Sequence, residues 1–97
     1  MIRHTVMIAC EGAAADAIDR IVDELRALPP LIPEIASYTV GRNLGLDGST
    51  ADLVIIADFA SVEDYRAYSA HPEHVRVVED HVKPVATGVN RVQFEVG

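Results

Sequence analysis

The 97-residue sequence has no tryptophan and only one cysteine, and aromatic residues make up 5% of it. Cys10 has no partner for a disulfide within the chain, and a small buried residue that closes a strand is the simpler interpretation of it. No P-loop, G-x-G-x-x-G fingerprint, serine or cysteine nucleophile motif or complete zinc ligand set occurs. The sequence therefore predicts a protein that uses neither a metal nor a cofactor.

Basic residues are also scarce, with 8 Lys and Arg against 15 Asp and Glu and a net charge of -7. Nucleic acids and anionic membrane surfaces repel such a chain, so neither is expected as a partner. No apolar run is long enough to span a bilayer, and the first residues lack a signal-peptide pattern. We expect a cytoplasmic protein with a single domain over residues 1–97.

Hydrophobic periodicity predicts the order of the elements. Alternating residues predict four strands, at 2–9, 35–42, 53–59 and 90–96. A period of 3.6 residues predicts one helix over 13–28 and a second helical region from Ser61 to Lys83, broken at His71-Pro72. The resulting β-α-β-β-α-β order is that of the ferredoxin-like α+β fold.

The strand at 53–59 is apolar on both faces over most of its length. One layer of helices covers only one face of a sheet, so something else must cover the other face. A second copy of the chain is the simplest partner, which predicts a homodimer whose two sheets pack face to face in a barrel-like core. In the last strand, Val92, Phe94 and Val96 are expected to point inward.

Three of the four histidines and two of the three tyrosines fall between Tyr65 and His81. Helical spacing from Pro72 places His74, Val75, Val78 and His81 in one inward arc. The helix dipole and burial both favour the neutral imidazole at His74, which can then act as a general base. The competing interpretation is a histidine held by a backbone carbonyl at the edge of the core.

The other rings of this segment have simpler interpretations. His71 precedes a proline and is expected to cap the helix. His81 and Tyr65 are expected to contribute packing alone.

Together, Ile2-Arg3-His4, Phe59-Ala60-Ser61 and the segment from Tyr68 to Val75 resemble the stress-responsive dimeric α/β-barrel (Dabb) family. The most specific element is the H-P-x-H-V motif at His71 to Val75. The resemblance spans essentially the whole chain and implies a ferredoxin-like protomer in a dimeric barrel. It also implies a stress-associated protein with a pocket for a small apolar or aromatic ligand.

One branch of that family, similar to the plant olivetolic acid (polyketide) cyclase, carries out an aldol-type cyclisation without a cofactor. The resemblance implies that His74 is the general base, assisted by Tyr68, and that His4 lines the pocket. Leu25 and Leu53 stand where the cyclase has polar pocket residues, which implies a more apolar pocket. The substrate-binding set expected here is His4, Leu25, Leu53, His71 and Val78.

Three functions remain open at this point. The first is a dimer that binds a small apolar ligand, and the second is a cofactor-free lyase or cyclase. The third is a cofactor-free monooxygenase of related fold, which the absence of tryptophan and the H-P-x-H-V motif both disfavour.

Overall fold

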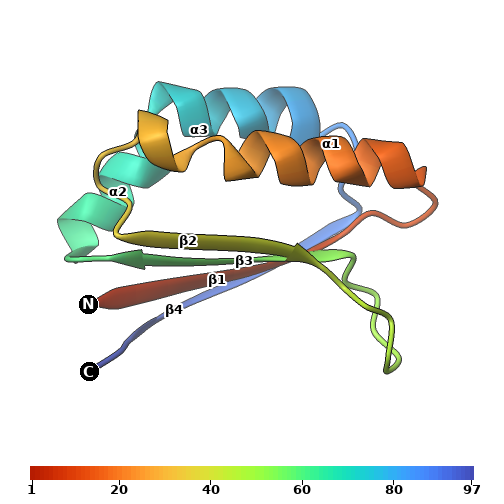
Figure 1. Cartoon of the computed structure of the whole chain (residues 1–97), viewed down its shortest axis with the longest axis horizontal. Helices are drawn as coiled ribbons and strands as arrows, with labels where there is room; N and C mark the ends of the chain where they lie inside the picture. The colour runs from red at the N-terminus through yellow and green to blue at the C-terminus, as the bar shows by residue number, and fades with distance from the viewer.

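A computed structural model describes all 97 residues. Its elements, in chain order, are β1 (Ile2–Ala9), α1 (Ala15–Arg26), a 3-10 turn (Pro29–Leu31), β2 (Ser37–Arg42), β3 (Leu53–Phe59), α2 (Val62–Ala70), α3 (Pro72–Val77), a π-helical turn (Val78–Val82) and β4 (Gly88–Glu95). The strands form one antiparallel sheet in the order β2-β3-β1-β4. All helices lie on one face of this sheet (Figure 1). The predicted ferredoxin-like α+β fold is confirmed.

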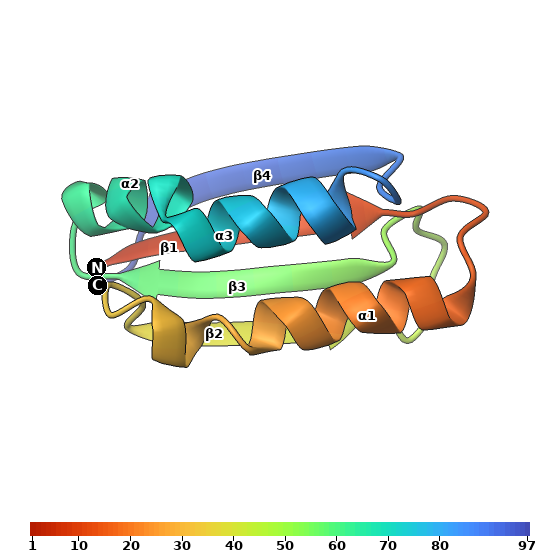
Figure 2. The ribbon, with the colours of Figure 1, turned by 90° about the horizontal axis from the view of Figure 1, so that it is seen from above.

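The core lies between the sheet and the helices. The pairing of β1 with β3 sets Val6 opposite Ile55 and His4 opposite Ala57, so these side chains point to the same face. All four are buried. Helix α1 adds its apolar stripe to this core, through Ile18, Ile21, Val22 and Leu25. Seen from above, α1 lies along β2 and β3, whereas α3 lies over β1 (Figure 2).

The second helical region is interrupted where the sequence predicts it. Ser61 begins α2 by accepting a hydrogen bond from the Asp64 N–H at 3.1 Å. His71 ends α2 in an extended conformation, and its Nδ1 accepts from the Glu73 N–H at 3.1 Å, which caps α3. Pro72 occupies the first helical position, where its missing N–H costs nothing.

The turn after α3 is wider than an α-helix. The Lys83 N–H bonds to the Val78 carbonyl at 2.8 Å, five residues back. This widening rotates the later residues relative to an ideal α-helix. His81 therefore leaves the line of His74, and its Nε2 lies 3.7 Å from a Glu24 oxygen of α1. Val75, expected in the inward arc, is exposed.

The expectation for the last strand was wrong for a single protomer. Gln93 pairs with His4 in the register, and its side chain reaches the His4 ring on the helix-covered face. Val92 and Phe94 therefore point to the opposite face, where they are 57% and 47% exposed. The predicted alternation of the strand is present, but its apolar set faces away from the helices.

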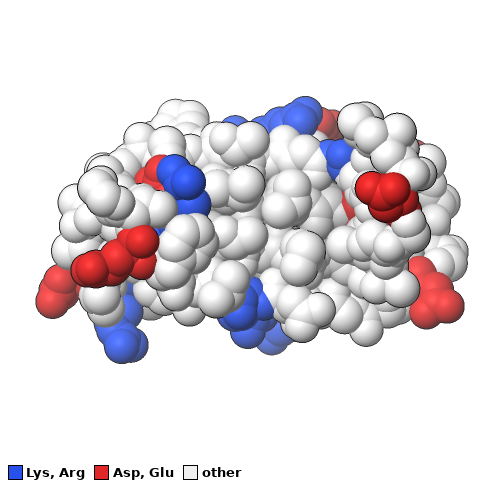
Figure 3. Space-filling model, turned by 90° about the horizontal axis from the view of Figure 1, so that it is seen from below, with Lys and Arg blue, Asp and Glu red and all other residues white.

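The sheet face opposite the helices is uncovered in the protomer. Its exposed apolar side chains come from three strands: Met7, Ile56, Val92 and Phe94. Charged side chains gather mainly toward the ends and edges of this face, and its middle is largely free of them (Figure 3). An apolar surface of this kind is typical of an interaction site.

Candidate functional site

A cavity of about 520 Å³ lies between the sheet and the second helical region. Its walls come from β1, α1, β3, α2, α3, the π-helical turn and β4. The volume is within the range of small-molecule sites in proteins. Apolar side chains form most of the lining, including Val6, Ile8, Leu25, Ile55, Val78 and Val82. The polar lining side chains relevant to chemistry are His4, Tyr65, Tyr68, His74 and Arg91.

His4 stands on β1 at the floor of the cavity and is 5% exposed. The Gln93 amide Nε2 donates to its Nδ1 at 2.8 Å. An amide nitrogen only donates, so Nδ1 carries no proton and the neutral ring is protonated at Nε2. Burial lowers the pKa of His4 to about 4, and the charges of His74 and Arg91 add to the effect. At neutral pH His4 is thus a hydrogen-bond donor through Nε2.

His74 approaches the cavity from the first turn of α3. Its Nδ1 lies 3.0 Å from the Ser69 carbonyl oxygen, and a carbonyl only accepts. The proton therefore sits on Nδ1, and Nε2 keeps its lone pair. Burial lowers the pKa of His74, an effect to which Arg91 and His71 contribute and which the Ser69 bond opposes. A neutral ring with a free lone pair is the form that a general base requires.

Tyr68 is 1% exposed, and its ring centroid lies 4.3 Å from that of His74. Its hydroxyl is 2.8 Å from the hydroxyl of Tyr38 on β2. Burial raises the pKa of Tyr38 to about 12 and also raises that of Tyr68. Both phenols are therefore neutral donors or acceptors. Tyr68 can donate into the cavity only when Tyr38 supplies the proton of the bond between them.

The structure brings most of the expected site residues together. His4, Leu25, Tyr68, His74 and Val78 all line the one cavity. Leu53 and His71 do not: Leu53 is buried near the β2–β3 loop, and the His71 ring caps α3. Leu53 points to the same face of the sheet as Ile55 but lies at the first position of β3, outside the cavity, and the His71 ring is held at the α3 cap.

The sequence did not predict three polar residues that lie in or beside the cavity. Tyr65 was assigned to packing but lines the cavity, with its ring centroid 4.9 Å from that of His4. Gln93 and Arg91 were expected to point outward on the last strand. The alternation at 90–96 correctly predicts that successive side chains point to opposite faces of the sheet. Only the pairing with β1 shows which of the two sets of side chains faces the helices.

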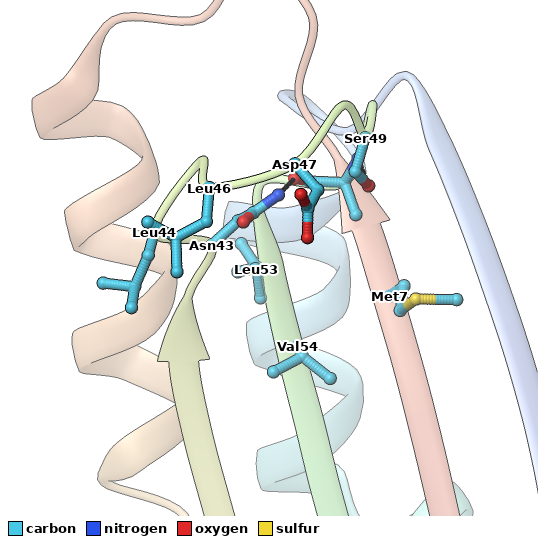
Figure 4. Close-up of a pocket in the computed structure, with 9 residues that line it drawn as sticks. Met7, Asn43, Leu44, Leu46, Asp47, Ser49, Leu53 and Val54 are labelled. Carbon is cyan, nitrogen blue, oxygen red and sulfur yellow. Dashed lines mark hydrogen bonds between the residues drawn. The ribbon is translucent and has the colours of Figure 1, made fainter.

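A second cavity, of about 430 Å³, lies under the loop between β2 and β3 (Figure 4). Leu44 and Leu46 of this loop line it together with Met7 and Val54 of the sheet, and the two leucines are 84% and 82% exposed. No histidine or tyrosine lines it. The histidine and tyrosine chemistry is thus confined to the first cavity.

The chain contains no group of three or more His, Cys, Asp or Glu side chains arranged to hold a metal ion. None of its helices has the length and hydrophobicity needed to cross a membrane.

Comparison with known proteins identifies relatives over nearly the full length. The model of a family described as the stress responsive A/B barrel domain matches residues 2–96. A stress-response A/B barrel domain-containing protein of Arabidopsis thaliana is 27% identical over 95 residues, which are 97% of this chain. Those residues are only 36% of the Arabidopsis protein, so the chain spans about a third of that relative's length.

Solved structures show the same architecture. A dimeric ferredoxin-like protein of unknown function from Thermobifida fusca is 29% identical, with a TM-score of 0.89 over 98% of this chain and 90% of that one. The hydroxynitrile lyase of Passiflora edulis shares the fold at 18% identity, with a TM-score of 0.85 over 99% of this chain and 93% of that one.

Proposed function

The chain belongs to the stress-responsive A/B barrel domain family, and from that premise we propose that it binds a small, mainly apolar ligand between its sheet and α3. The observation that carries the proposal is the cavity itself. Aliphatic side chains from β1, α1, β3 and the π-helical turn surround a volume suited to one small molecule, with polar groups at few positions.

We further propose that the protein acts as a homodimer formed through the uncovered sheet face. The exposed side chains of Met7, Ile56, Val92 and Phe94 support this, and so does the dimeric relative from Thermobifida fusca. In such a dimer both ligand cavities remain on the outer, helix-covered sides. The dimer would then stabilise the sheet that forms the floor of each cavity.

Filling the cavity tests the ligand proposal. Val78 is half-buried and lines the cavity, so Val78→Trp places a large ring in the ligand volume. Binding of 4-butylbenzyl alcohol, a neutral apolar probe, should weaken at least about tenfold, because an aromatic side chain takes up much of the space a ligand would use. Isothermal titration calorimetry measures the affinity, and circular dichroism verifies folding.

The matched control is Val62→Trp, which adds the same ring to an exposed position of α2 outside the cavity. Its affinity for the alcohol should equal that of the parent protein. Equal affinities in all three proteins, or no binding to the parent, would contradict the proposal.

A second function, a cofactor-free lyase, is favoured by one specific observation. The two histidines of the cavity present complementary ring nitrogens, a lone pair at His74 Nε2 and a proton at His4 Nε2. The hydroxynitrile lyase of Passiflora edulis shows that the same fold hosts a lyase in another protein. Fold alone does not transfer a reaction, so the support comes from the pair of rings.

The proposed step is enolisation of a carbonyl compound. His74 Nε2 takes a proton from the carbon next to the carbonyl, and the electron pair of that C–H bond moves to make the enolate. The His4 Nε2–H, or the Tyr68 hydroxyl when Tyr38 donates to it, supplies a hydrogen bond to the enolate oxygen. Reprotonation, aldol addition or elimination then returns the proton from His74.

Proton exchange tests this step without knowledge of the natural substrate. In D₂O, the protein should accelerate exchange of the methyl and methylene protons of a simple β-diketone, followed by NMR. His74→Ala should reduce the protein-dependent rate at least about a hundredfold, in line with typical general-base contributions. His81→Ala, on the same helical region but outside the cavity, should keep the parent rate. Unchanged exchange in His74→Ala would exclude His74 as the base.

A further inference from the structure

Carboxylates are absent from the cavity wall. The chain has 15 Asp and Glu residues, yet none is among the 17 residues that surround the cavity. Four side chains of that wall, in contrast, are able to carry positive charge: His4, His74, Lys83 and Arg91. The electrostatic character of the cavity is thus opposite to that of the whole molecule.

Only one of these four side chains contributes an uncompensated positive charge. His4 and His74 are held neutral by burial. Lys83 Nζ lies 2.7 Å from a Glu79 oxygen in an exposed ion pair. Arg91 forms no ion pair and no side-chain hydrogen bond, although every other arginine in the chain except Arg66 has an acidic or carbonyl partner.

The strand register places Arg91 on the cavity side of β4. Arg91 pairs with Val6 of β1, between Gln93 opposite His4 and Val89 opposite Ile8. The nearest carboxylate on this face of β4 is Glu95, four residues away, or about 13 Å along the strand. Nothing within the strand therefore neutralises Arg91 beside the cavity.

We propose that Arg91 binds the carboxylate of the ligand, so that this protein selects apolar molecules that carry one acidic group. The aliphatic lining takes the hydrocarbon or aromatic body, and the guanidinium at the β4 side of the cavity takes the acid. A guanidinium presents two parallel N–H groups that match a carboxylate. Since the net charge of -7 disfavours anions at a distance, the preference must come from this local contact.

This inference rests on the proposed function, because it assigns the head group of the same ligand. Three probes that share the same hydrocarbon body distinguish ligand binding in the cavity from the role of Arg91. They are 4-butylbenzoate, 4-butylbenzyl alcohol and 4-butylbenzylamine, which are anionic, neutral and cationic. Because the Arg91 side chain is exposed, isothermal titration calorimetry at low ionic strength should give the benzoate about fivefold tighter binding than the alcohol, the upper range for an exposed ion pair. The amine should bind most weakly.

Arg91→Gln should remove the preference for the benzoate and leave the affinity for the alcohol unchanged. Arg66→Gln is the matched control, since Arg66 is an exposed arginine of α2 outside the cavity and its loss changes the net charge equally. That variant should keep the parent preference.

The outcomes are distinguishable. Equal binding of benzoate and alcohol to the parent protein, or a preference that survives in Arg91→Gln, overturns the role of Arg91 and leaves the apolar cavity in place. A failure of all three probes to bind overturns both the inference and the ligand proposal.

Discussion

At the scale of single residues, the hydrogen-bond partner of each histidine ring decides what that ring can do in the cavity. The Ser69 carbonyl fixes the proton of His74 on Nδ1, whereas the Gln93 amide excludes a proton from Nδ1 of His4. The two rings have the same chemistry in solution, yet one presents an acceptor and the other a donor. The sequence predicted His4 and His74 as candidates, but their tautomers depend on contacts 5 and 89 residues apart in the chain.

Because His4 is buried, its contribution to the free energy of unfolding depends on pH. With a folded-state pKa of about 4 and an unfolded value of about 6.5, native His4 binds fewer protons than the unfolded chain between these pH values. Its contribution is full above pH 6.5 and is lost as the pH falls from 6.5 to 4, by about 3 kcal/mol in total.

Replacing the Gln93 amide by a carboxylate should oppose this effect. In Gln93→Glu, the new carboxylate accepts a hydrogen bond from the Nδ1–H of the imidazolium and so favours the charged ring, and the pKa of His4 should rise by at least about one unit. The loss of stability between pH 6.5 and 4 should shrink accordingly. NMR titration of the His4 ring and urea unfolding at several pH values measure the two quantities.

The control for that variant is Asn90→Asp, the same amide-to-acid change on the opposite face of β4. It should leave the pKa of His4 close to its parent value. An unchanged pKa in Gln93→Glu, or an equal rise in both variants, would show that Gln93 does not set the protonation of His4.

At the scale of elements, the break between α2 and α3 is what directs His74 toward the cavity. His71 adopts an extended backbone, its ring caps α3, and Pro72 starts the new helix in a different direction. In a continuous helix, the direction of the His74 side chain would be fixed by its helical spacing from Tyr68. The break was predictable because a residue before proline avoids the helical conformation. The π-helical turn was not predictable, because no local signal in residues 78–82 distinguishes it from an α-helix.

Loss of the cap should therefore affect both stability and the site. His71→Ala removes the acceptor for the Glu73 N–H and should lower the free energy of unfolding by about 1 kcal/mol. His71→Asp restores a capping acceptor and should recover most of that loss. Urea unfolding of both variants and of the parent gives the comparison. Equal losses in the two variants would mean that the His71 ring acts through packing rather than through the cap.

At the scale of the whole molecule, the same sheet serves two purposes. Its helix-covered face forms the floor of the cavity, and its other face presents the apolar side chains of β1, β3 and β4. The two-sided apolarity of residues 53–59 predicted this arrangement. The sequence predicted Val92 and Phe94 on the inner face, but in the structure they extend the uncovered apolar surface of β1 and β3.

If this uncovered face forms the dimer, a charge placed there should dissociate it. The parent protein should have twice the mass of the chain at micromolar concentration, and Val92→Asp should be monomeric, because a buried carboxylate without a partner is costly. Analytical ultracentrifugation measures both masses. Val75→Asp, at an exposed valine of α3, is the control and should stay dimeric. A monomeric parent protein would contradict the proposed dimer.

Local periodicity and neighbouring residues were enough to predict the order of the elements, the two-sided apolarity of residues 53–59, the helix break and His74 as a candidate. The candidacy of His4 and Tyr68 came from the family resemblance of the sequence. Only the tertiary structure places Arg91 and Gln93 on the helix-covered face of β4 and Leu53 and His71 outside the cavity, and only its contacts decide which nitrogen of each histidine holds the proton. A strand alternates in either of two senses, and only its pairing with β1 selects one of them.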